Sequence, residues 1–232
     1  MNSFDASILR FLNQYSQVSS YFDYAVATVQ ENNLLKAGAL MPILWWFWFR
    51  KGDETTQRVC RSHLIATILG ALVSLFVGRA LATYLPFRVR PLYIDALAFK
   101  PPFGTDVSFF MSWSSFPSDH AALLCALASG LWFVSRWAGC VCFFYVFLGI
   151  CGTRVYMGIH YPTDVLAGAA IGVGVAAWFN TERMRDWLAR HALRLMEAKP
   201  ALFYTGFFLL SYQICDLFNA TRAAGQALLH AF

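Results

Sequence analysis

The apolar residues of this chain lie in long continuous blocks, and this arrangement restricts the possible folds more than any other feature of the sequence. The blocks run for roughly 17 to 25 residues, the length that an α-helix needs to cross the hydrocarbon core of a bilayer. A soluble helical bundle would show narrower apolar stripes with polar faces between them. Hydrophobic residues fill 58% of the 232 positions and charged residues 13%, which is far from the balance of a soluble domain. The sequence therefore predicts an all-α integral membrane protein.

The blocks predict six transmembrane helices within a single domain that covers residues 1–232. The expected spans are 34–49, 64–85, 120–135, 140–157, 162–179 and 201–218, so that residues 34–218 form a six-helix bundle. A polar, proline-containing stretch, residues 86–117, separates the second span from the third and predicts an outward loop. Gly168 and Gly172 have the small-xxx-small spacing that lets two helices approach closely.

Residues 1–33 show a different pattern, in which apolar side chains recur every three or four positions. The stripe consists of Phe4, Ile8, Phe11, Tyr15, Val18 and Phe22. Its spacing predicts an amphipathic helix that lies in the membrane interface, although a helix packed on the rest of the protein would have the same periodicity. We expect no cleavable signal peptide, because the segment lacks a continuous apolar core and a small-residue cleavage site.

The positions of the basic residues predict the orientation of the bundle. Ten of the 18 lysine and arginine residues lie between spans one and two, three and four, or five and six: Arg50, Lys51, Arg58, Arg61, Arg136, Arg183, Arg185, Arg190, Arg194 and Lys199. Lysine and arginine accumulate on the cytoplasmic side of membrane proteins, so these three loops are expected to be cytoplasmic. Both termini and the loop 86–117 then face outward.

Neither the net charge nor the cysteines indicate a further function. The formal net charge of +5 does not predict nucleic-acid binding, because the basic residues lie at the ends of apolar blocks and form no basic face. The six cysteines lie in or beside apolar segments and are interpreted as buried, unpaired thiols.

Several polar side chains lie at the outward ends of the predicted spans. Arg79 is placed near the outer hydrocarbon boundary, where an arginine requires a protein interior or a polar ligand. Arg88 and Arg90 follow the same span directly. The ends of the next three spans contribute Ser118, Asp119, His120, Arg154, His160 and Asp164. The predicted topology brings all of these residues to the outer face.

Such a set is suited to phosphoryl transfer. Several guanidinium groups can hold phosphate oxygens and stabilise the charge of the transition state, and a helix beginning at Ser118 adds backbone N–H donors. With Pro162 as the first helical residue, Asp164 can accept a hydrogen bond from His160. That bond fixes the tautomer and leaves the other ring nitrogen free as a nucleophile. A protonated His120 can supply the proton that the leaving oxygen needs.

The chain resembles the type 2 phosphatidic acid phosphatase superfamily, which also includes vanadium haloperoxidases. The third motif of that family, Ser-Arg-x5-His-x3-Asp, is matched at 153–164 with threonine in place of serine. The second motif, Pro-Ser-Gly-His, is matched at 117–120 with aspartate in place of glycine. Motifs and helix layout together extend the resemblance over most of the chain.

The first family motif, Lys-x6-Arg-Pro, is the weakest match. Arg90 and Pro91 fit its end, but Thr83 stands where the lysine is expected. Arg79 is a candidate to replace that lysine, with Arg88 as a second basic ligand. The sequence leaves open whether Arg88 or Arg90 takes the role of the family arginine.

The resemblance implies a role for each matched residue. His160 would be the nucleophile that forms a phosphohistidine, Asp164 its orienting partner, and His120 the acid for the leaving group. The phosphate would be bound by Arg154, Ser118, Arg90 and Arg88, to which position and charge add Arg79. Asp119 is expected to point away from the phosphate or to pair with an arginine, because it would repel an anion.

The resemblance further implies a multi-pass lipid phosphatase of the bacterial cytoplasmic membrane, with its active site facing the periplasm. Some bacterial members that resemble undecaprenyl pyrophosphate phosphatases share the aspartate variant of the second motif. The expected reaction is therefore hydrolysis of undecaprenyl pyrophosphate to undecaprenyl phosphate. Phosphatidic acid, phosphatidylglycerol phosphate and lipid A are alternative substrates, and transfer of the phosphate to another lipid is an alternative reaction.

No metal or other cofactor is expected, because the arginines already supply the positive charge that a phosphate needs. The partners implied are the lipid phosphate and the bilayer, whereas the oligomeric state cannot be read from the sequence. A membrane transporter is the alternative outside the enzymes, but its charged residues would lie nearer the bilayer midplane, often in broken helices.

Overall fold

In the computed structural model, residues 2–106 and 111–230 are described, and all regular secondary structure within them is helical. Positions 107–110, part of the predicted outward loop, lie outside the described residues. The helices in chain order are α1 (Ser3–Asn13), α2 (Ser20–Glu31), η1 (Ala37–Ala39), α3 (Met41–Phe49), α4 (Glu54–Tyr84), η2 (Pro91–Tyr93), η3 (Asp95–Leu97), α5 (Asp119–Val134), α6 (Arg136–Phe144), the π-helix η4 (Tyr145–Cys151), α7 (Gly152–Tyr156), α8 (Pro162–Phe179), α9 (Glu182–Ala198), α10 (Pro200–Asp216) and α11 (Asn219–His230).

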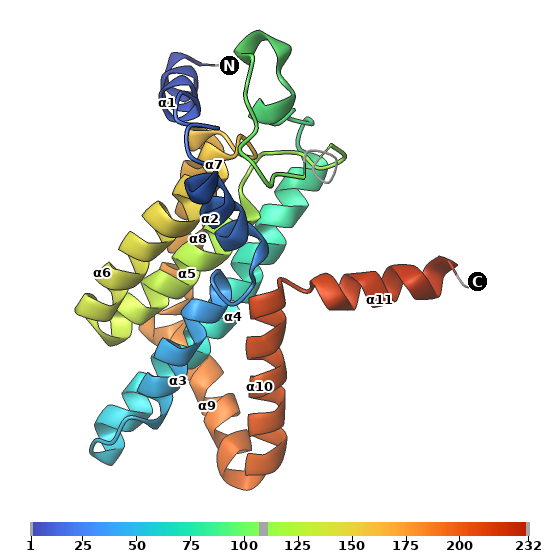
Figure 1. Cartoon of the computed structure of the whole chain (residues 1–232). Coiled ribbons are helices and arrows are strands. Elements are labelled where there is room, and N and C mark those ends of the chain that lie inside the picture. Colours follow the sequence, from blue (N-terminus) through green and yellow to red (C-terminus); the bar gives the residue numbers. More distant parts are fainter. Residues whose placement is uncertain (1, 107–110, 231–232) are drawn as a thin grey trace.

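Helix α5 forms the centre of the bundle and packs against α4, α6 and α8 (Figure 1). All of its residues from Ala121 to Leu131 are buried, as expected for a helix that is apolar on every side. Its first turn is capped by the hydroxyl of Ser118, which accepts a hydrogen bond from the backbone of Ala121 at 3.4 Å. The start of α5 is therefore fixed, and with it the position of the second motif.

The two glycines of α8 allow α8 to approach α5 closely. A Cβ atom at Gly168 would lie 2.3 Å from the carbonyl oxygen of Ser118, and one at Gly172 would lie 2.2 Å from that of Ala122. The close approach predicted from the small-xxx-small spacing is thus confirmed. It locks the beginning of α5 against the beginning of α8, so the second and third motifs lie side by side.

Three helices are long and apolar enough to cross a membrane: Glu54–Tyr84, Arg136–Tyr156 and Pro162–Phe179. The helices Ala37–Phe49 and Asp119–Val134 are apolar but shorter. The helix α4 begins ten residues before the predicted span, because Asp53 caps a polar first turn that extends beyond the apolar block. The all-helical membrane architecture is confirmed, whereas the count of six spans stays a prediction.

The N-terminal segment contains two helices where the sequence analysis predicts one. The break lies at Gln17, whose backbone is left-handed with φ 65° and whose N–H donates to the carboxylate of Asp23 at 2.9 Å; such side-chain bonds compete with helix formation. On α1, Asp5 and Leu9 are buried, while Phe4 and Phe11 are exposed. One face of α1 therefore packs on the bundle, and its place in the membrane interface stays a prediction.

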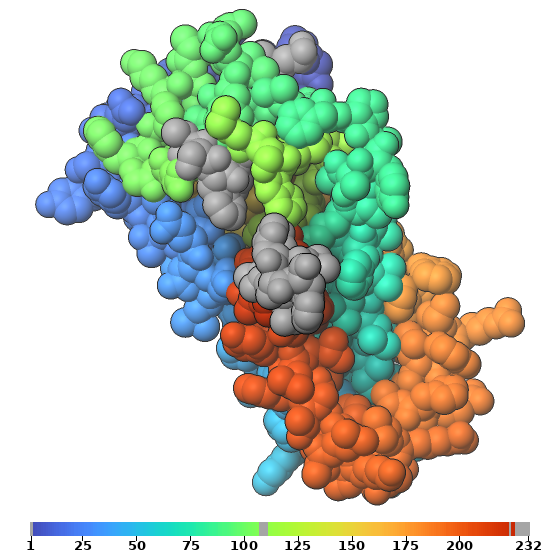
Figure 2. Space-filling model, turned by 90° about the vertical axis from the view of Figure 1, so that its right-hand side faces the viewer, coloured from blue at the N-terminus to red at the C-terminus, as the bar shows by residue number. Residues whose placement is uncertain are grey.

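The C-terminal helices approach the outward end of the bundle. After α10 the chain turns through left-handed residues at Leu217 and Phe218, and α11 projects away from the bundle (Figure 1). The carbonyl oxygen of Leu217 accepts a hydrogen bond from the Arg79 guanidinium of α4 at 2.8 Å. Figure 2 shows this face, with the C-terminal helices in red beside α4 in teal.

The glycine packing predicts a specific loss of stability. In Gly172→Ala, the new methyl group would meet backbone atoms of Ala122 and Ala126, so we expect a loss of about 1–3 kcal/mol from overpacking. The matched control is Gly174→Ala, because a Cβ at Gly174 would meet no atom within 4 Å in the described part of the chain. Thermal unfolding of the detergent-solubilised protein, followed by tryptophan fluorescence, measures both. Equal unfolding midpoints for the two variants would contradict this packing.

Candidate active site

A cavity of about 390 Å³ lies where α2, α4, α5, α7 and the start of α11 meet. Basic side chains dominate its polar lining: Lys36, Arg79, Arg90, Arg154 and Arg222. The lining also includes His120 and three carboxylates, those of Glu31, Asp106 and Asp119. With both charge and volume matched to an anion, the cavity is suited to binding a phosphate group.

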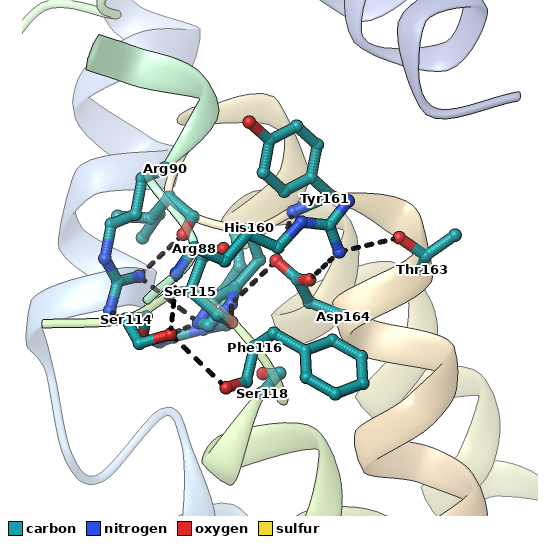
Figure 3. A network of polar contacts seen from close by, with 12 residues as sticks. Arg88, Arg90, Ser114, Ser115, Phe116, Ser118, His160, Tyr161, Thr163 and Asp164 are labelled. Atoms are coloured by element: carbon teal, nitrogen blue, oxygen red, sulfur yellow. Dashed lines mark hydrogen bonds and ion pairs between the residues drawn. The ribbon is translucent and has the colours of Figure 1, made fainter. Parts of the chain in front are cut away.

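The imidazole of His160 lies directly against two of these arginines. Its Nε2 atom is 3.1 Å from Nη2 of Arg154 and 3.5 Å from Nη1 of Arg90. Its Nδ1 atom is 2.8 Å from the carbonyl oxygen of Ser115 (Figure 3). Because a carbonyl oxygen can only accept, Nδ1 carries the proton and Nε2 keeps its lone pair. The reactive nitrogen therefore points at the guanidinium groups that would hold a phosphate.

The turn after α7 sets the distance between Arg154 and His160. The backbone N–H groups of Ile159 and His160 donate to the carbonyl oxygen of Arg154 at 3.1 and 3.3 Å. Gly158 adopts φ +69° in this turn, and a Cβ there would lie 2.6 Å from the ring of Phe99. Glycine suits both the backbone conformation and the close approach. The spacing of the third motif thus encodes a local turn that brings guanidinium and imidazole together.

Asp164 does not take the position expected from the sequence. Its Oδ2 atom lies 3.6 Å from Nδ1 of His160, which is beyond hydrogen-bonding distance. Instead Oδ2 accepts from the backbone N–H of Tyr161 at 2.8 Å, and Oδ1 accepts from Arg88 (Figure 3). At the third position of α8, the carboxylate is closest to the N-cap backbone, where it completes a capping box. The hydrogen bond to Nδ1 comes from the Ser115 carbonyl, which corrects that part of the prediction.

The structure separates the two arginines that the sequence leaves open. Arg90 is buried, lines the cavity and donates to the carbonyl oxygens of Ile159 at 2.6 Å and Trp113 at 3.2 Å. Arg88 is absent from the cavity lining and pairs with the carboxylates of Asp5 and Asp164. Arg90 is therefore placed to contact a phosphate, and Arg88 joins α1 to α8.

His120 and Asp119 form a second polar group at the cavity. Nδ1 of His120 lies 2.9 Å from Oδ1 of Asp119, whose Oδ2 lies 3.6 Å from Nε of Arg79. The expectation that Asp119 pairs with an arginine is confirmed. Nε2 of His120 is buried and has no hydrogen-bond partner in the described part of the chain. It is therefore available to a ligand in the cavity.

Ser118 is buried and does not line the cavity. Its hydroxyl is occupied by the cap of α5, and its backbone N–H donates to the carbonyl oxygen of Asp164 at 3.1 Å. The predicted contact between Ser118 and phosphate is thus not provided by this arrangement. The reason is the N-cap geometry, which turns the hydroxyl back towards the helix.

Three cavity residues were missed in the sequence analysis: Gln30, Lys36 and Arg222. Gln30 accepts a hydrogen bond from Nη1 of Arg154 at 3.0 Å and so helps to orient that guanidinium. These residues lie far from the motifs in sequence. A local signal exists for Lys36 alone, as a basic residue at the outward end of an apolar block.

Burial and mutual repulsion shape the electrostatics of the cavity. Burial, reinforced by Arg154, lowers the pKa of Arg90 to about 10, so this side chain stays charged near neutrality. Burial also lowers the pKa of His160 to about 4; Arg154 and Arg90 act in the same direction and Asp164 opposes them. Neutral His160 beside charged Arg90 is the combination that a nitrogen nucleophile for phosphate requires.

Fold and cavity together define an all-helical membrane protein with an anion-binding site at one end of its bundle. The family model described as the PAP2 superfamily matches residues 63–186. The chain belongs to this superfamily of lipid phosphatases, and the resemblance drawn from its motifs is confirmed.

Individual relatives are distant. The chain is 29% identical over 143 residues to YbjG of Escherichia coli (strain K12), named provisionally as an undecaprenyl-diphosphatase; the match covers 61% of this chain and 64% of YbjG, just under two thirds of its length. It is 23% identical over 173 residues to the undecaprenyl-diphosphatase BcrC of Bacillus subtilis (strain 168), covering 74% of this chain and 80% of BcrC. The crystal structure of LpxE from Aquifex aeolicus shares the fold, with a TM-score of 0.51 and 23% identity over 75% of this chain and 92% of LpxE.

The different surroundings of Arg88 and Arg90 predict different effects of their removal. We expect Arg90→Ala to lower kcat/KM for a lipid diphosphate by about 10²–10³-fold, the loss typical of one preorganised donor to the transition state. We expect Arg88→Ala to retain kcat/KM within about tenfold and to lower the unfolding midpoint, because two buried carboxylates lose a partner. Phosphate release and thermal unfolding of both variants measure this. The reverse pattern would show that Arg88 is the phosphate ligand.

Proposed function

We propose that this protein hydrolyses a polyprenyl diphosphate, with undecaprenyl pyrophosphate as substrate and undecaprenyl phosphate as product, through a phosphohistidine on His160. The observation that carries the proposal is the position of Nε2 of His160, 3.1 Å from Arg154 and 3.5 Å from Arg90. Both arginines line the same cavity as His120. A terminal phosphate held by the two guanidinium groups would lie within reach of a nucleophile and of an acid.

In the first step, Nε2 of His160 attacks the terminal phosphorus atom. The P–N bond forms while the bond from that phosphorus to the bridging oxygen breaks, and the electron pair passes to the bridging oxygen of the lipid monophosphate. Protonated His120 gives its Nε2 proton to this oxygen. Arg90 and Arg154 exchange their contacts with the imidazole for contacts with the phosphate oxygens, where negative charge accumulates.

In the second step, water releases the phosphate. His120, now neutral, accepts a proton from a water molecule whose oxygen attacks the phosphohistidine phosphorus. The P–N bond breaks, its electron pair returns to Nε2 of His160, and inorganic phosphate leaves. The Ser115 carbonyl holds Nδ1 throughout, at 2.8 Å in the structure, and so keeps Nε2 as the reacting nitrogen.

The names of the relatives support a diphosphate as the substrate, since YbjG and BcrC are both named for undecaprenyl diphosphate. The size and charge of the cavity agree with this, because five basic residues exceed what one phosphate group needs. The lipid tail would lie in the bilayer beside the bundle, leaving the diphosphate in the cavity.

We place the protein in the bacterial cytoplasmic membrane with the cavity facing the periplasm. In Figure 1 the loop between α3 and α4 and the hairpin between α9 and α10 lie at the end of the bundle opposite α7. The basic clusters at 50–61 and 183–199 belong to that far end, which the positive-inside rule makes cytoplasmic. Six spans in one domain, with α1 and α2 at the outer interface, complete this topology.

The reaction is proposed to need no metal ion. Arg90 and Arg154 supply fixed positive charge where a metal would otherwise neutralise the phosphate. The described residues contain no group of three or more His, Cys, Asp or Glu side chains placed to hold a metal ion. Activity that survives EDTA in the purified protein would support this proposal, and activity restored only by added Mg²⁺ would refute it.

His160→Ala is expected to abolish hydrolysis, because no other group can form the covalent intermediate; the loss should be about 10⁴-fold or more. With a substrate labelled in its terminal phosphate, the wild-type protein should carry a label that survives alkali and is lost in acid, as a phosphohistidine does. The matched control is His191→Ala, since His191 is exposed on α9. A folded His160→Ala protein with unchanged turnover would refute the mechanism.

The pKa of His160 predicts the pH dependence. Because burial lowers the pKa of His160 to about 4, the imidazole stays neutral and nucleophilic well below the ordinary histidine pKa of about 6.5. As pH falls, kcat/KM of the free enzyme should therefore hold between pH 7 and 5 and decline only as pH approaches 4. Initial rates at low substrate concentration measure the profile, and fluorescence at each pH checks folding. A decline centred near pH 6.5 would contradict the assignment.

A further inference from the structure

Lys36 is a buried lysine whose side chain lines the active-site cavity. It precedes η1, has an exposed fraction of 6% and contributes to the same cavity as Arg90 and Arg154. It lies outside residues 63–186, which the family model matches, and outside all three motifs. Its position therefore reflects the tertiary structure of this chain and no local pattern.

The Lys36 ammonium lacks the protein partners that the other cavity cations have. Arg154 donates to Gln30, and Arg79 donates to the carbonyl oxygen of Leu217. Arg222 donates to Asn219 and lies over the ring of Trp113. Within residues 2–106 and 111–230, no hydrogen bond or ion pair to the Lys36 ammonium is present.

A buried ammonium without a partner is strongly unfavourable unless an anion balances it. Burial, and next the charge of Arg154, lower the pKa of Lys36 to about 8, so the unpartnered ammonium is still largely charged near neutrality. The fold thus maintains a positive charge in the cavity that no protein group neutralises. A bound anion is the simplest compensation.

The terminal phosphate does not account for Lys36. In the proposed reaction that phosphate must lie against Nε2 of His160, where Arg154 and Arg90 already stand. A diphosphate has a second anionic group, the phosphate attached to the lipid, and this group gains charge when the bridging bond breaks. A compact ammonium can stabilise that charge as it develops.

We propose that Lys36 binds the lipid-attached phosphate of a diphosphate substrate, so that the cavity selects lipid diphosphates over lipid monophosphates. This inference rests on the proposed function and assigns the second phosphate subsite to a residue outside the family motifs. Lys36 would act by stabilising the leaving lipid monophosphate, whose bridging oxygen takes the electron pair of the broken P–O bond. A monophosphate substrate would leave Lys36 without this contact.

The test compares two substrates of equal chain length, farnesyl diphosphate and farnesyl monophosphate, with the full-length protein in detergent. We expect Lys36→Gln to lower kcat/KM for the diphosphate by about 10- to 100-fold, the range for loss of a charged hydrogen bond. The value for the monophosphate should change by less than about threefold. The matched control is Lys100→Gln, because Lys100 is exposed and is placed outside the cavity; it should leave both values unchanged.

A second measurement guards against a general structural effect. Because Lys36→Gln removes an unpaired buried charge, its unfolding midpoint should equal or exceed that of the wild type. In a His160→Ala background, pyrophosphate should raise the unfolding midpoint more than phosphate does, and Lys36→Gln should remove this difference.

Each outcome separates the two proposals. If the wild-type protein releases phosphate from neither substrate and forms no phosphohistidine, the proposed function fails. If the wild type is active but Lys36→Gln lowers kcat/KM equally for both substrates, or for neither, the role of Lys36 is overturned. A lowered midpoint with equal stabilisation by phosphate and pyrophosphate would also overturn it, because Lys36 would then be structural.

Discussion

The contact between Arg154 and His160 is the interaction on which the rest of the site depends. It places a buried guanidinium against a buried imidazole, and further cations surround the pair. Such a cluster is unfavourable in the absence of an anion, because burial and like charges both disfavour the charged forms. The protein offsets this with fixed acceptors: Gln30 for Arg154, and the Ile159 carbonyl for Arg90. A phosphate would replace the unfavourable terms with charge-assisted hydrogen bonds. The site is thus organised for its ligand at the expense of local stability, as functional sites commonly are.

The rigidity that this arrangement needs comes from layers around the cluster. The α5–α8 contact, closed by Gly168 and Gly172, fixes the second motif against the third. Behind it, Arg88 lies between the buried carboxylates of Asp5 and Asp164 and ties α1 to α8. On α2, Asp23 accepts a hydrogen bond from the Tyr156 hydroxyl at 2.6 Å. These bonds hold the N-terminal helices against the bundle, so the segment that carries Gln30 and Lys36 belongs to the wall of the cavity.

The sequence predicts most of the local structure and the core of the site, for identifiable reasons. The predicted span 162–179 coincides with α8, because Pro162 marks its start and the apolar block its end. Arg154 and His160 could be paired from their spacing, since a single turn connects them. The partner of Asp164 could not be predicted: the Ser115 carbonyl that takes Nδ1 of His160 comes from a loop 45 residues away. The break at Gln17 depends likewise on a side chain, Asp23, that a helical periodicity does not reveal.

The missing lysine of the first motif shows how a fold can replace a residue that a pattern lacks. Thr83, at the position of the family lysine, is exposed and donates to the carbonyl oxygen of Arg79 one turn earlier in α4. Arg79 does line the cavity, as its sequence position suggests, but its guanidinium already contacts Leu217 and Asp119. The cavity therefore has a committed arginine on α4 and an uncommitted ammonium from Lys36, which enters from the start of a different helix. Positive charge at a phosphate site acts through space and falls off with distance. The residue that supplies it can come from any segment that reaches the cavity, which a motif defined along one segment cannot reveal.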